Sequence, residues 1–453
     1  MSPAPHSWKR VGGVARTTVA PVRIGLLGCG TIGTGVVKLL RQNGGLLAQR
    51  LGRPLELVAV VDKLLTPRNA LRIPTSMMVH DPAAMVERPD IDIVVELFGG
   101  IEPARSLILK ALAAGKDVVT ANKLLLAEHG EEIFRAAEKA GAGVGFEASV
   151  GGGIPIIRTL REALAGDRQS AVYGIVNGTC NSILTTMSES DVEFGDALKQ
   201  AQAAGLAEAN PALDIEGHDT AHKLCLLAGL AFGAMLKPSE VHTEGITHVT
   251  QTDIRFAREL GFTIKLLAIA KNDDGAIEAR VHPTMVPARH VLASVGGAFN
   301  AIYIHGEALG STMYLGLGAG QMPTATAVVA DILDLARERL GGGATRSHPL
   351  GYPVSFIKRA RVKPMADVIC EYYLRFMAED KPGVLGRIAS VLGRNHISIA
   401  SVIQQDRDVA RTVPVIMRTH EASERNLMRA LGQISRQRIV EAPPVFIRIE
   451  ERL

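Results

Sequence analysis

The chain has 453 residues, of which 47% are hydrophobic and 21% are charged, and its formal net charge is +4. At roughly 150 residues per domain, this length predicts two to four domains, and the composition excludes large disordered tracts. The near balance of charge, without a basic run interleaved with aromatic residues, argues against nucleic acid as a partner.

Neither a membrane nor an oxidising compartment is indicated. No apolar run approaches the roughly 20 residues of a membrane helix, and residues 1–20 are expected to form a flexible extension rather than a secretory signal. The cysteines (Cys29, Cys180, Cys225 and Cys370) show no Cys-x-x-Cys spacing, which disfavours a zinc site and a disulfide framework. We therefore expect a cytoplasmic protein with reduced thiols.

Strands alternate with helices over residues 21–150. Strands are predicted at VRIGLLG from Val22, at LELVAVVD, at Ile91–Gly99 and at Lys116–Lys123. Helices are predicted from Val36 to Leu40, at Ala104–Ala114 and at Glu131–Ala140, while residues 43–54 are expected to be an extended connection. The alternation predicts an α/β domain with a mostly parallel sheet covered on both faces.

The glycines Gly151–Gly153 mark a change in pattern. Helical patterns at Gly195–Ala204 and Asp219–Ala231 then mix with strand character at Ile264–Ala270 and Ala279–Val286. This mixture predicts an α+β catalytic domain over residues 151–340. Residues 341–370, rich in glycine and proline, are expected to be a linker, and residues 371–453 a compact unit of strand, turn, helix and strand.

A glycine-rich loop follows the first strand. Gly28, Gly30 and Gly33 match G-x-G-x-x-G between a strand and a helix, where glycines allow a tight turn and close approach to a pyrophosphate. Asp62 ends the next strand, where a carboxylate can bind ribose hydroxyls. The loop therefore predicts a Rossmann-type NAD(P)-binding domain rather than a plain strand-to-helix turn. The choice of cofactor stays open, because Asp62 favours NAD whereas Lys63 and Arg68 could bind the 2′-phosphate of NADP.

Four charged residues gather in an apolar neighbourhood: Glu208, Asp214, Asp219 and Lys223. Asp219 and Lys223 are one helical turn apart and share a face. A lysine oriented by carboxylates could donate a proton to a carbonyl oxygen, as a general acid does. An ordinary exposed Asp/Lys pair at a helix start is the alternative interpretation.

Six segments resemble the homoserine dehydrogenase family, in this order along the chain: LGCGTIGTGVV, VVTANKLLLAEHG, FEASVGGGIPII, YGIVNGTCNSIL, GLAEANPALDIEGHDTAHKL and GLGAGQMPTATAVVADI. The resemblance spans Val22 to Leu335. It implies reversible reduction of L-aspartate 4-semialdehyde to L-homoserine with NADPH or NADH, in the biosynthesis of threonine, methionine and isoleucine. Because no kinase domain precedes these segments, we expect a monofunctional enzyme.

The resemblance also implies roles for individual residues. Lys223 would exchange a proton with the substrate oxygen, with Asp219 beside it, and Lys123 would lie between nicotinamide and substrate. Glu208 and Asp214 would hold the substrate ammonium group, to which carboxylates are suited. Further cofactor contacts would come from Thr31, Ile32, Thr120, Gly178 and Gly320.

The turn FEASVGGGIP resembles the family's site for a monovalent cation, sodium or potassium. Main-chain carbonyls of Glu147, Val150, Gly152 and Ile154 would coordinate the ion, since hard cations take oxygen ligands. The alternative is that the glycines form only a hinge between domains. The pair His218 and His222 has the spacing of two metal ligands on one helix face, but the sequence places no third ligand near them.

The C-terminal segment MAEDKPGVLGRIASVLGRNHISIASVIQ resembles the ACT domain, a small ferredoxin-like βαββαβ unit that binds amino acids. A turn at Asp380 to Leu385 would face the ligand, with Asn395 at the far end of the following helix. The resemblance implies a threonine effector and pairing of subunits into a homodimer or homotetramer. An assembly module without an effector is the alternative.

Other functions fit the residues less well. A related oxidoreductase such as aspartate dehydrogenase is one alternative. An aspartate semialdehyde dehydrogenase would need a nucleophilic cysteine near a histidine, which the sequence does not show. A ligand sensor without catalysis would be expected to have lost Lys123, Asp219 or Lys223, and all three are present.

Overall fold

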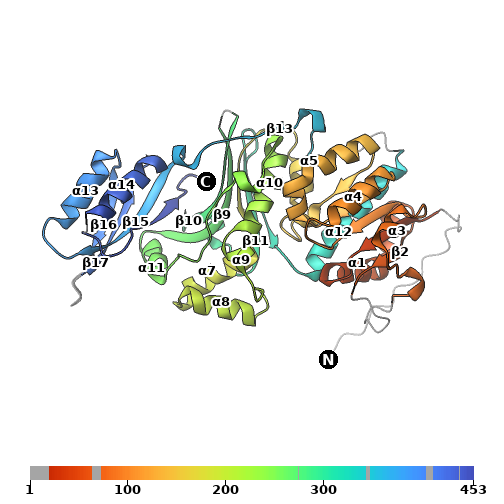
Figure 1. Cartoon of the computed structure of the whole chain (residues 1–453), viewed down its shortest axis with the longest axis horizontal. Coiled ribbons are helices and arrows are strands. Elements are labelled where there is room, and N and C mark those ends of the chain that lie inside the picture. The colour runs from red at the N-terminus through yellow and green to blue at the C-terminus, as the bar shows by residue number, and fades with distance from the viewer. Residues whose placement is uncertain (1–19, 64–72, 274, 343–346, 405–411, 438) are drawn as a thin grey trace, which may run out of the picture.

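We describe a computed structural model covering residues 20–63, 73–273, 275–342, 347–404, 412–437 and 439–453. The N-terminal extension up to residue 19 and Arg68 lie outside the described residues. The molecule is elongated, with an N-terminal α/β unit at one end, a mixed sheet in the middle and the C-terminal unit at the other end (Figure 1). No helix among the described residues is both long and apolar enough to span a membrane.

The N-terminal unit contains an all-parallel sheet in the order β2-β1-β3-β4-β5. Its strands are β1 (Val22–Leu27), β2 (Leu55–Val61), β3 (Ile93–Glu96), β4 (Asp117–Thr120) and β5 (Val144–Gly145). The chain runs from β1 outward to β2 and then returns to the other side of β1 to form β3. Ligands of such sheets bind at the carboxyl ends of the strands where the order reverses.

Helices cover both faces of this sheet, which confirms the predicted α/β architecture. Ile24 and Leu26 point into the core shared with α1 (Thr31–Gln42) and α12 (Gln321–Leu340), whereas Leu27 belongs to the core on the opposite face. That face is covered by α3 (Pro82–Glu87), α4 (Ala104–Ala113) and α5 (Lys123–Ala140). The alternation follows from the two-residue repeat of a strand.

Two elements differ from the sequence-based expectation. The connection expected over residues 43–54 is largely helical, because α2 (Gly44–Leu51) buries Leu47 and ends at Gly52 in the left-handed conformation. Helix α5 begins at Lys123, well before the expected start at Glu131, because the side chain of Asn122 accepts a hydrogen bond from the amide of Leu125 at 3.1 Å. This cap places Lys123 in the first turn of a helix rather than at the end of a strand.

The middle of the chain forms a mixed sheet, in which β9 (Phe262–Asp273) and β10 (Ala276–Pro287) form a long hairpin. The neighbouring strands are β6 (Gln169–Ile175), β11 (Phe299–Gly306) and β12 (Gly310–Leu317). One face is covered by α7 (Gly178–Ser190), α10 (His218–Phe232) and α11 (Gln251–Glu259). Strands mixed with long helices agree with the α+β expectation for this region.

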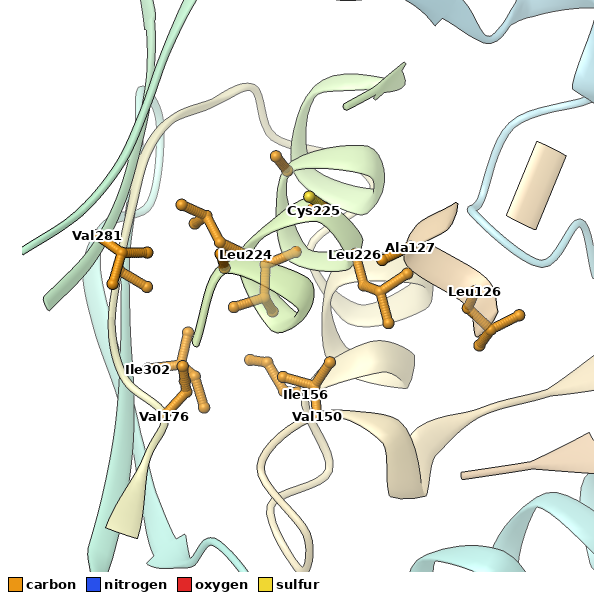
Figure 2. Close-up of a cluster of buried hydrophobic side chains, with 14 of the residues drawn as sticks. Leu126, Ala127, Val150, Ile156, Val176, Leu224, Cys225, Leu226, Val281 and Ile302 are labelled. Carbon is orange, nitrogen blue, oxygen red and sulfur yellow. The ribbon is translucent and has the colours of Figure 1, made fainter. Parts of the chain in front are cut away.

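Helix α10 joins the middle sheet to the N-terminal unit. Leu224 lies toward Val281 and Ile302 of the sheet, and Leu226 lies toward Ala127 of α5 (Figure 2). All of these side chains belong to one buried apolar cluster. A helix that is apolar on most of its surface is buried on most sides, and α10 accordingly packs between the two units.

The C-terminal unit has the predicted βαββαβ order, with α13 (Val384–Arg394) and α14 (Glu424–Arg436) as its helices. Its strands are β15 (Ile369–Glu379), β16 (Ile399–Gln404), β17 (Thr412–Thr419) and β19 (Val445–Ile449), in the spatial order β19-β15-β17-β16. Strand β19 also pairs with β10, where Thr284 lies opposite Arg448. The sheet of the C-terminal unit is therefore continuous with the middle sheet.

Packing crosses the boundaries that the sequence suggests. Helix α12 falls within residues 151–340, yet it packs on α1 and on the N-terminal sheet. The expected linker contributes β13 (Lys358–Arg359), which pairs with β7 (Ala234–Met235), and β14 (Arg361–Val362), which pairs with β10. These pairs attach it to the middle domain on its way to the C-terminal unit.

Candidate active site

The glycine-rich loop turns tightly between β1 and α1. Gly28 has a φ of +95°, and a Cβ on Gly33 would lie 2.2 Å from the carbonyl oxygen of Gly28. A Cβ on Gly30 would meet no atom within 4 Å, so the loop is open on that side of Gly30. Thr31 and Ile32 form the first turn of α1, whose unpaired amides can bind a phosphate.

A pocket of 740 Å³ lies beside this loop, at the carboxyl ends of β2 and β3. Asp62 and Lys63 line it together with His80 and Phe98. The carboxylate of Asp62 accepts a hydrogen bond from the amide of Cys29 at 2.5 Å, which fixes it at the rim of the loop. The volume and its position fit the adenosine half of a dinucleotide.

Glu96, at the end of β3, is a buried carboxylate that sequence reasoning missed. It accepts hydrogen bonds from the Thr120 hydroxyl at 2.6 Å and from the amide of Phe98 at 2.7 Å. Burial raises the pKa of Glu96. The sequence signal for Glu96 was a charged residue inside the apolar run IDIVVELFG. In the structure, the Glu96 carboxylate holds Thr120 at the edge of the site.

The centre of the site is a buried carboxylate shared by two lysines. The Lys223 ammonium lies 2.7 Å from Oδ2 of Asp219 and donates to the carbonyl of Val176 at 2.6 Å. The Lys123 ammonium lies 2.9 Å from Oδ1 of Asp219. Because Lys123 follows β4 and Lys223 lies on α10, this contact brings the middle domain to the carboxyl edge of the N-terminal sheet.

Burial and charge act on these groups in opposite directions. Burial lowers the pKa of Lys223, although the Asp219 carboxylate opposes it, so Lys223 is a better acid than a solvated lysine. For Lys123 burial is the largest cause and acts downward, but the charge and hydrogen bond of Asp219, together with the charges of Asp214 and Glu208, outweigh it and raise the pKa. The two ammonium groups overcome the desolvation of Asp219 and hold its pKa below the usual value. Asp219 and Lys223 are both buried, which does not fit the ordinary exposed pair considered as an alternative.

Two more carboxylates lie near the triad. Asp214, in α9 (Ala212–Ile215), accepts a hydrogen bond on Oδ1 from the Asn177 amide at 2.7 Å, and Asn177 also donates to Asp219 at 2.9 Å. Glu208 is exposed before α9, close enough for its charge to act on Lys123. Sequence reasoning did not assign a role to Asn177, although it stands just before Gly178 at the start of α7.

The glycine turn after β5 packs against the segment that precedes α12. A Cβ on Gly152 would lie 2.4 Å from the carbonyl oxygen of Gly318, two residues before Gly320. The Glu147 carboxylate accepts hydrogen bonds from the amides of Ile157 and Arg158 at 2.7 and 2.9 Å. Both carboxylate oxygens of Glu147 are thus hydrogen-bonded within the turn, and its neighbours Val150 and Ile154 are buried there.

Neither a metal cluster nor a reactive thiol is found among the described residues. No group of three or more His, Cys, Asp or Glu side chains there could hold a metal ion, so His218 and His222 lack further ligands of these types. Cys29, Cys180, Cys225 and Cys370 are buried and unpaired, and burial raises the pKa of each thiol. An acyl-enzyme mechanism through cysteine is therefore not supported.

Family models match three parts of the chain: the NAD-binding domain of homoserine dehydrogenase at residues 28–147, homoserine dehydrogenase at 155–333 and the ACT domain at 372–436. The homoserine dehydrogenase of Neisseria gonorrhoeae is 44% identical over 431 residues, which cover 95% of this chain and 99% of that protein.

The chain belongs to the homoserine dehydrogenase family. The family's enzyme from Pseudomonas aeruginosa is 40% identical over 95% of this chain and 99% of its own length. The crystal structure of a homoserine dehydrogenase from Thiobacillus denitrificans superimposes with a TM-score of 0.91 at 43% identity, covering 95% of this chain and 99% of that one. The protein is an NAD(P)-dependent oxidoreductase with a C-terminal ACT domain.

Proposed function

We propose that the protein reduces L-aspartate 4-semialdehyde reversibly to L-homoserine, with Lys223 as the proton donor. The observation that carries this assignment is the placement of Asp219 between Lys223 and Lys123, at the junction of the nucleotide-binding and catalytic domains. A buried ammonium with a lowered pKa, held by a carboxylate and a backbone carbonyl, is suited to give up a proton.

The remaining residues position the substrate. The nicotinamide of the cofactor, when bound, would supply the hydride for the aldehyde carbon. Lys223 donates its proton to the oxygen as that oxygen becomes an alcohol, and the proton is then replaced from solvent. Asp214 and Glu208 bind the ammonium end of the substrate, because carboxylates and cations form strong charge-assisted hydrogen bonds. Lys123, beside Asp219 and partly exposed, would lie between substrate and cofactor.

The cofactor site fits NADP or NAD. Gly28, Gly30 and Gly33 would bind the pyrophosphate with Thr31 and Ile32, and Asp62 would lie at the ribose. Thr120, Gly178 and Gly320 would form the nicotinamide end. A hyperthermophilic archaeal homoserine dehydrogenase was solved in complex with NADPH; it is 28% identical over 70% of this chain, with a TM-score of 0.60. This supports NADPH as the first cofactor to test.

A monovalent cation, sodium or potassium, would bind the carbonyls of Glu147, Val150, Gly152 and Ile154. The Ile154 carbonyl already accepts the amide of Ile156 at 2.8 Å, which leaves one lone pair for an ion. The tight contact of this turn with Gly318 supports a structural role, because an ion there would fix the segment leading to Gly320.

The C-terminal unit would bind threonine as a feedback effector in the biosynthesis of threonine, methionine and isoleucine. Asp380 and Gly383 line a pocket of 270 Å³ where α13 begins, and helix amides there can bind a carboxylate. We further propose that the protein acts in the cytoplasm as a homodimer or homotetramer.

The first test is the rate of NADPH and NADH oxidation with L-aspartate 4-semialdehyde. We expect turnover by the wild type, and a loss of at least a hundredfold in kcat for Lys223→Ala. Lys199→Ala is the matched control, because the Lys199 side chain is 77% exposed on α8 (Phe194–Ala203). Threonine should inhibit the wild type. Lack of turnover with both cofactors would overturn the assignment, and inhibition absent at all threonine concentrations would overturn only the effector.

A further inference from the structure

Asn177 is oriented by its own backbone neighbourhood. It is the N-cap of α7, and its side-chain Oδ1 accepts a hydrogen bond from the amide of Cys180 at 2.8 Å. Because Oδ1 is used in this way, the NH2 group of the amide must face the opposite direction. The side chain is buried, with 5% of its surface exposed, so water does not compete for these bonds.

The NH2 group faces two carboxylates at once. Nδ2 donates to Oδ1 of Asp214 at 2.7 Å and to Oδ2 of Asp219 at 2.9 Å. Each carboxylate thus receives one of the two N–H groups, and the donor capacity of the amide is complete. Among the described residues, Asn177 is the only side chain hydrogen-bonded to the Asp214 carboxylate.

The same backbone segment also holds the proton donor. Val176, the preceding residue, accepts a hydrogen bond from the Lys223 ammonium through its carbonyl at 2.6 Å. Two successive residues after β6 therefore contact Lys223, Asp219 and Asp214. Oδ2 of Asp214 accepts no hydrogen bond from the described residues, and Asp214 is only half buried, so this oxygen is available to a ligand.

We propose that Asn177 is a positioning residue, which aims the free oxygen of Asp214 at the substrate's ammonium group while it anchors that carboxylate to the Asp219–Lys223 pair. The inference rests on the proposed function. Asp214 binds the amino end of the substrate and Lys223 protonates its aldehyde oxygen. The amide of Asn177 fixes the distance between these two side chains, because it bonds both Asp214 and Asp219. Asn177 thus contributes to the choice of an amino aldehyde over an aldehyde without the amino group.

The test compares L-aspartate 4-semialdehyde with succinate semialdehyde, which has the same chain without the amino group. Two variants, Asn177→Ser and Asn177→Asp, keep a side-chain oxygen that can cap α7. The serine side chain is too short to reach both carboxylates, and the aspartate side chain offers acceptors in place of donors. The measured quantity is the ratio of kcat/KM for the two aldehydes, which does not depend on the fraction of active protein.

We expect the ratio to fall at least tenfold in both variants, with the KM for NADPH within twofold of the wild type. In a double-mutant cycle with Asp214→Asn, substitution of Asn177 should no longer change the ratio, because Asp214→Asn removes the carboxylate through which Asn177 acts. A ratio unchanged in the folded variants, or a fall that persists undiminished with Asp214→Asn, would overturn the proposal. A wild type that reduces neither aldehyde would instead overturn the proposed function, and this inference with it.

Discussion

Asp331, on α12, is a buried carboxyl group with an unusual protonation state. Burial, with the nearby Glu147 carboxylate as a second cause, raises the pKa of Asp331 to about 8. Its Oδ2 accepts the amide of Glu147 at 2.8 Å, so this side chain fixes the start of the proposed cation turn. The group is neutral in the folded protein at pH 6 but ionised in the unfolded chain, whose ordinary pKa is about 3.9.

The free energy of unfolding should therefore depend on pH through Asp331. The contribution of protonated Asp331 to the free energy of unfolding is fully present below about pH 4. It falls as the pH rises and is lost once the pH has passed about 8. The greatest slope from this one group is about 1.4 kcal/mol per pH unit. Urea unfolding at pH 5, 6.5 and 8 should show a decline that is shallower in Asp331→Asn than in the wild type.

The control for this prediction is Asp196→Asn, since the Asp196 side chain is 63% exposed. This variant keeps Asp331, so its free energy of unfolding should fall between pH 5 and 8 as in the wild type. Equal slopes in wild type and Asp331→Asn would contradict a raised pKa for Asp331.

At the scale of elements, the glycine-rich loop and α2 give opposite expectations for adding a methyl group. In Gly33→Ala the new Cβ would lie 2.2 Å from a backbone oxygen, so the loop must shift and the phosphate site with it. We expect the Kd for NADPH, followed by its fluorescence, to rise at least tenfold.

Gly45→Ala is the matched control on the next helix. Its Cβ would meet no atom within 4 Å, and the position is inside α2. Alanine is the better helix former by roughly 0.5–1 kcal/mol, so this variant should melt at a slightly higher temperature with unchanged NADPH affinity. Comparable loss of affinity in both variants would refute the steric argument.

Elements set by local patterns could be predicted from the sequence. The strands around the glycine loop, α8, α10 and the βαββαβ order follow from apolar periodicity and turn residues, and the Asp219–Lys223 pair follows from its i, i+4 spacing. The early start of α5 was missed because a single cap, Asn122, decides it. Helix α2 was missed because two glycines weaken its pattern.

Contacts between distant segments could not be predicted in this way. The sharing of Asp219 by Lys123 and Lys223 joins residues a hundred positions apart. The resemblance to a family implied that both lysines belong to the site, but the contact of Lys123 with Asp219 was not expected. The role of Asn177 and the packing of α12 on α1 depend on the tertiary fold, which local apolar periodicity does not report. For Glu96 the one local signal was a charge inside an apolar run, and its contact with Thr120 again depends on the fold.

At the scale of the whole molecule, buried ion pairs connect the C-terminal unit to the middle domain. Arg375 of β15 donates to both oxygens of Asp253 on α11, at 2.7 and 3.1 Å, and Asp253 is fully buried. Arg448 of β19 donates to both oxygens of Glu244 at 2.9 and 2.8 Å. Glu244 is 38% exposed and Arg448 also pairs with Glu424 of its own unit, so Arg375–Asp253 is the more deeply buried of the two ion pairs between the units.

Removing one partner should be costly, because it leaves a buried charge uncompensated. We expect Arg375→Met to reduce the free energy of unfolding by about 3 kcal/mol, measured by urea titration. Arg135→Met is the control: Arg135 and Glu131 are 62% and 58% exposed, and losing such a pair costs less than about 1 kcal/mol. Similar effects of the two substitutions would mean that the contact between the units contributes little.

The pairing of β10 with β19 has a consequence for how the chain matures. On the ribosome, β10 is synthesised long before its partner strand β19. The edge of β10 around Thr284 therefore has unpaired backbone groups until the C-terminal unit has been made. Arg280, on the same strand, likewise lacks the carboxylate of Glu450 until then. An open strand edge invites pairing with other chains. Substitutions that slow the folding of the C-terminal unit should therefore lower the yield of soluble enzyme, even when they lie far from every catalytic group.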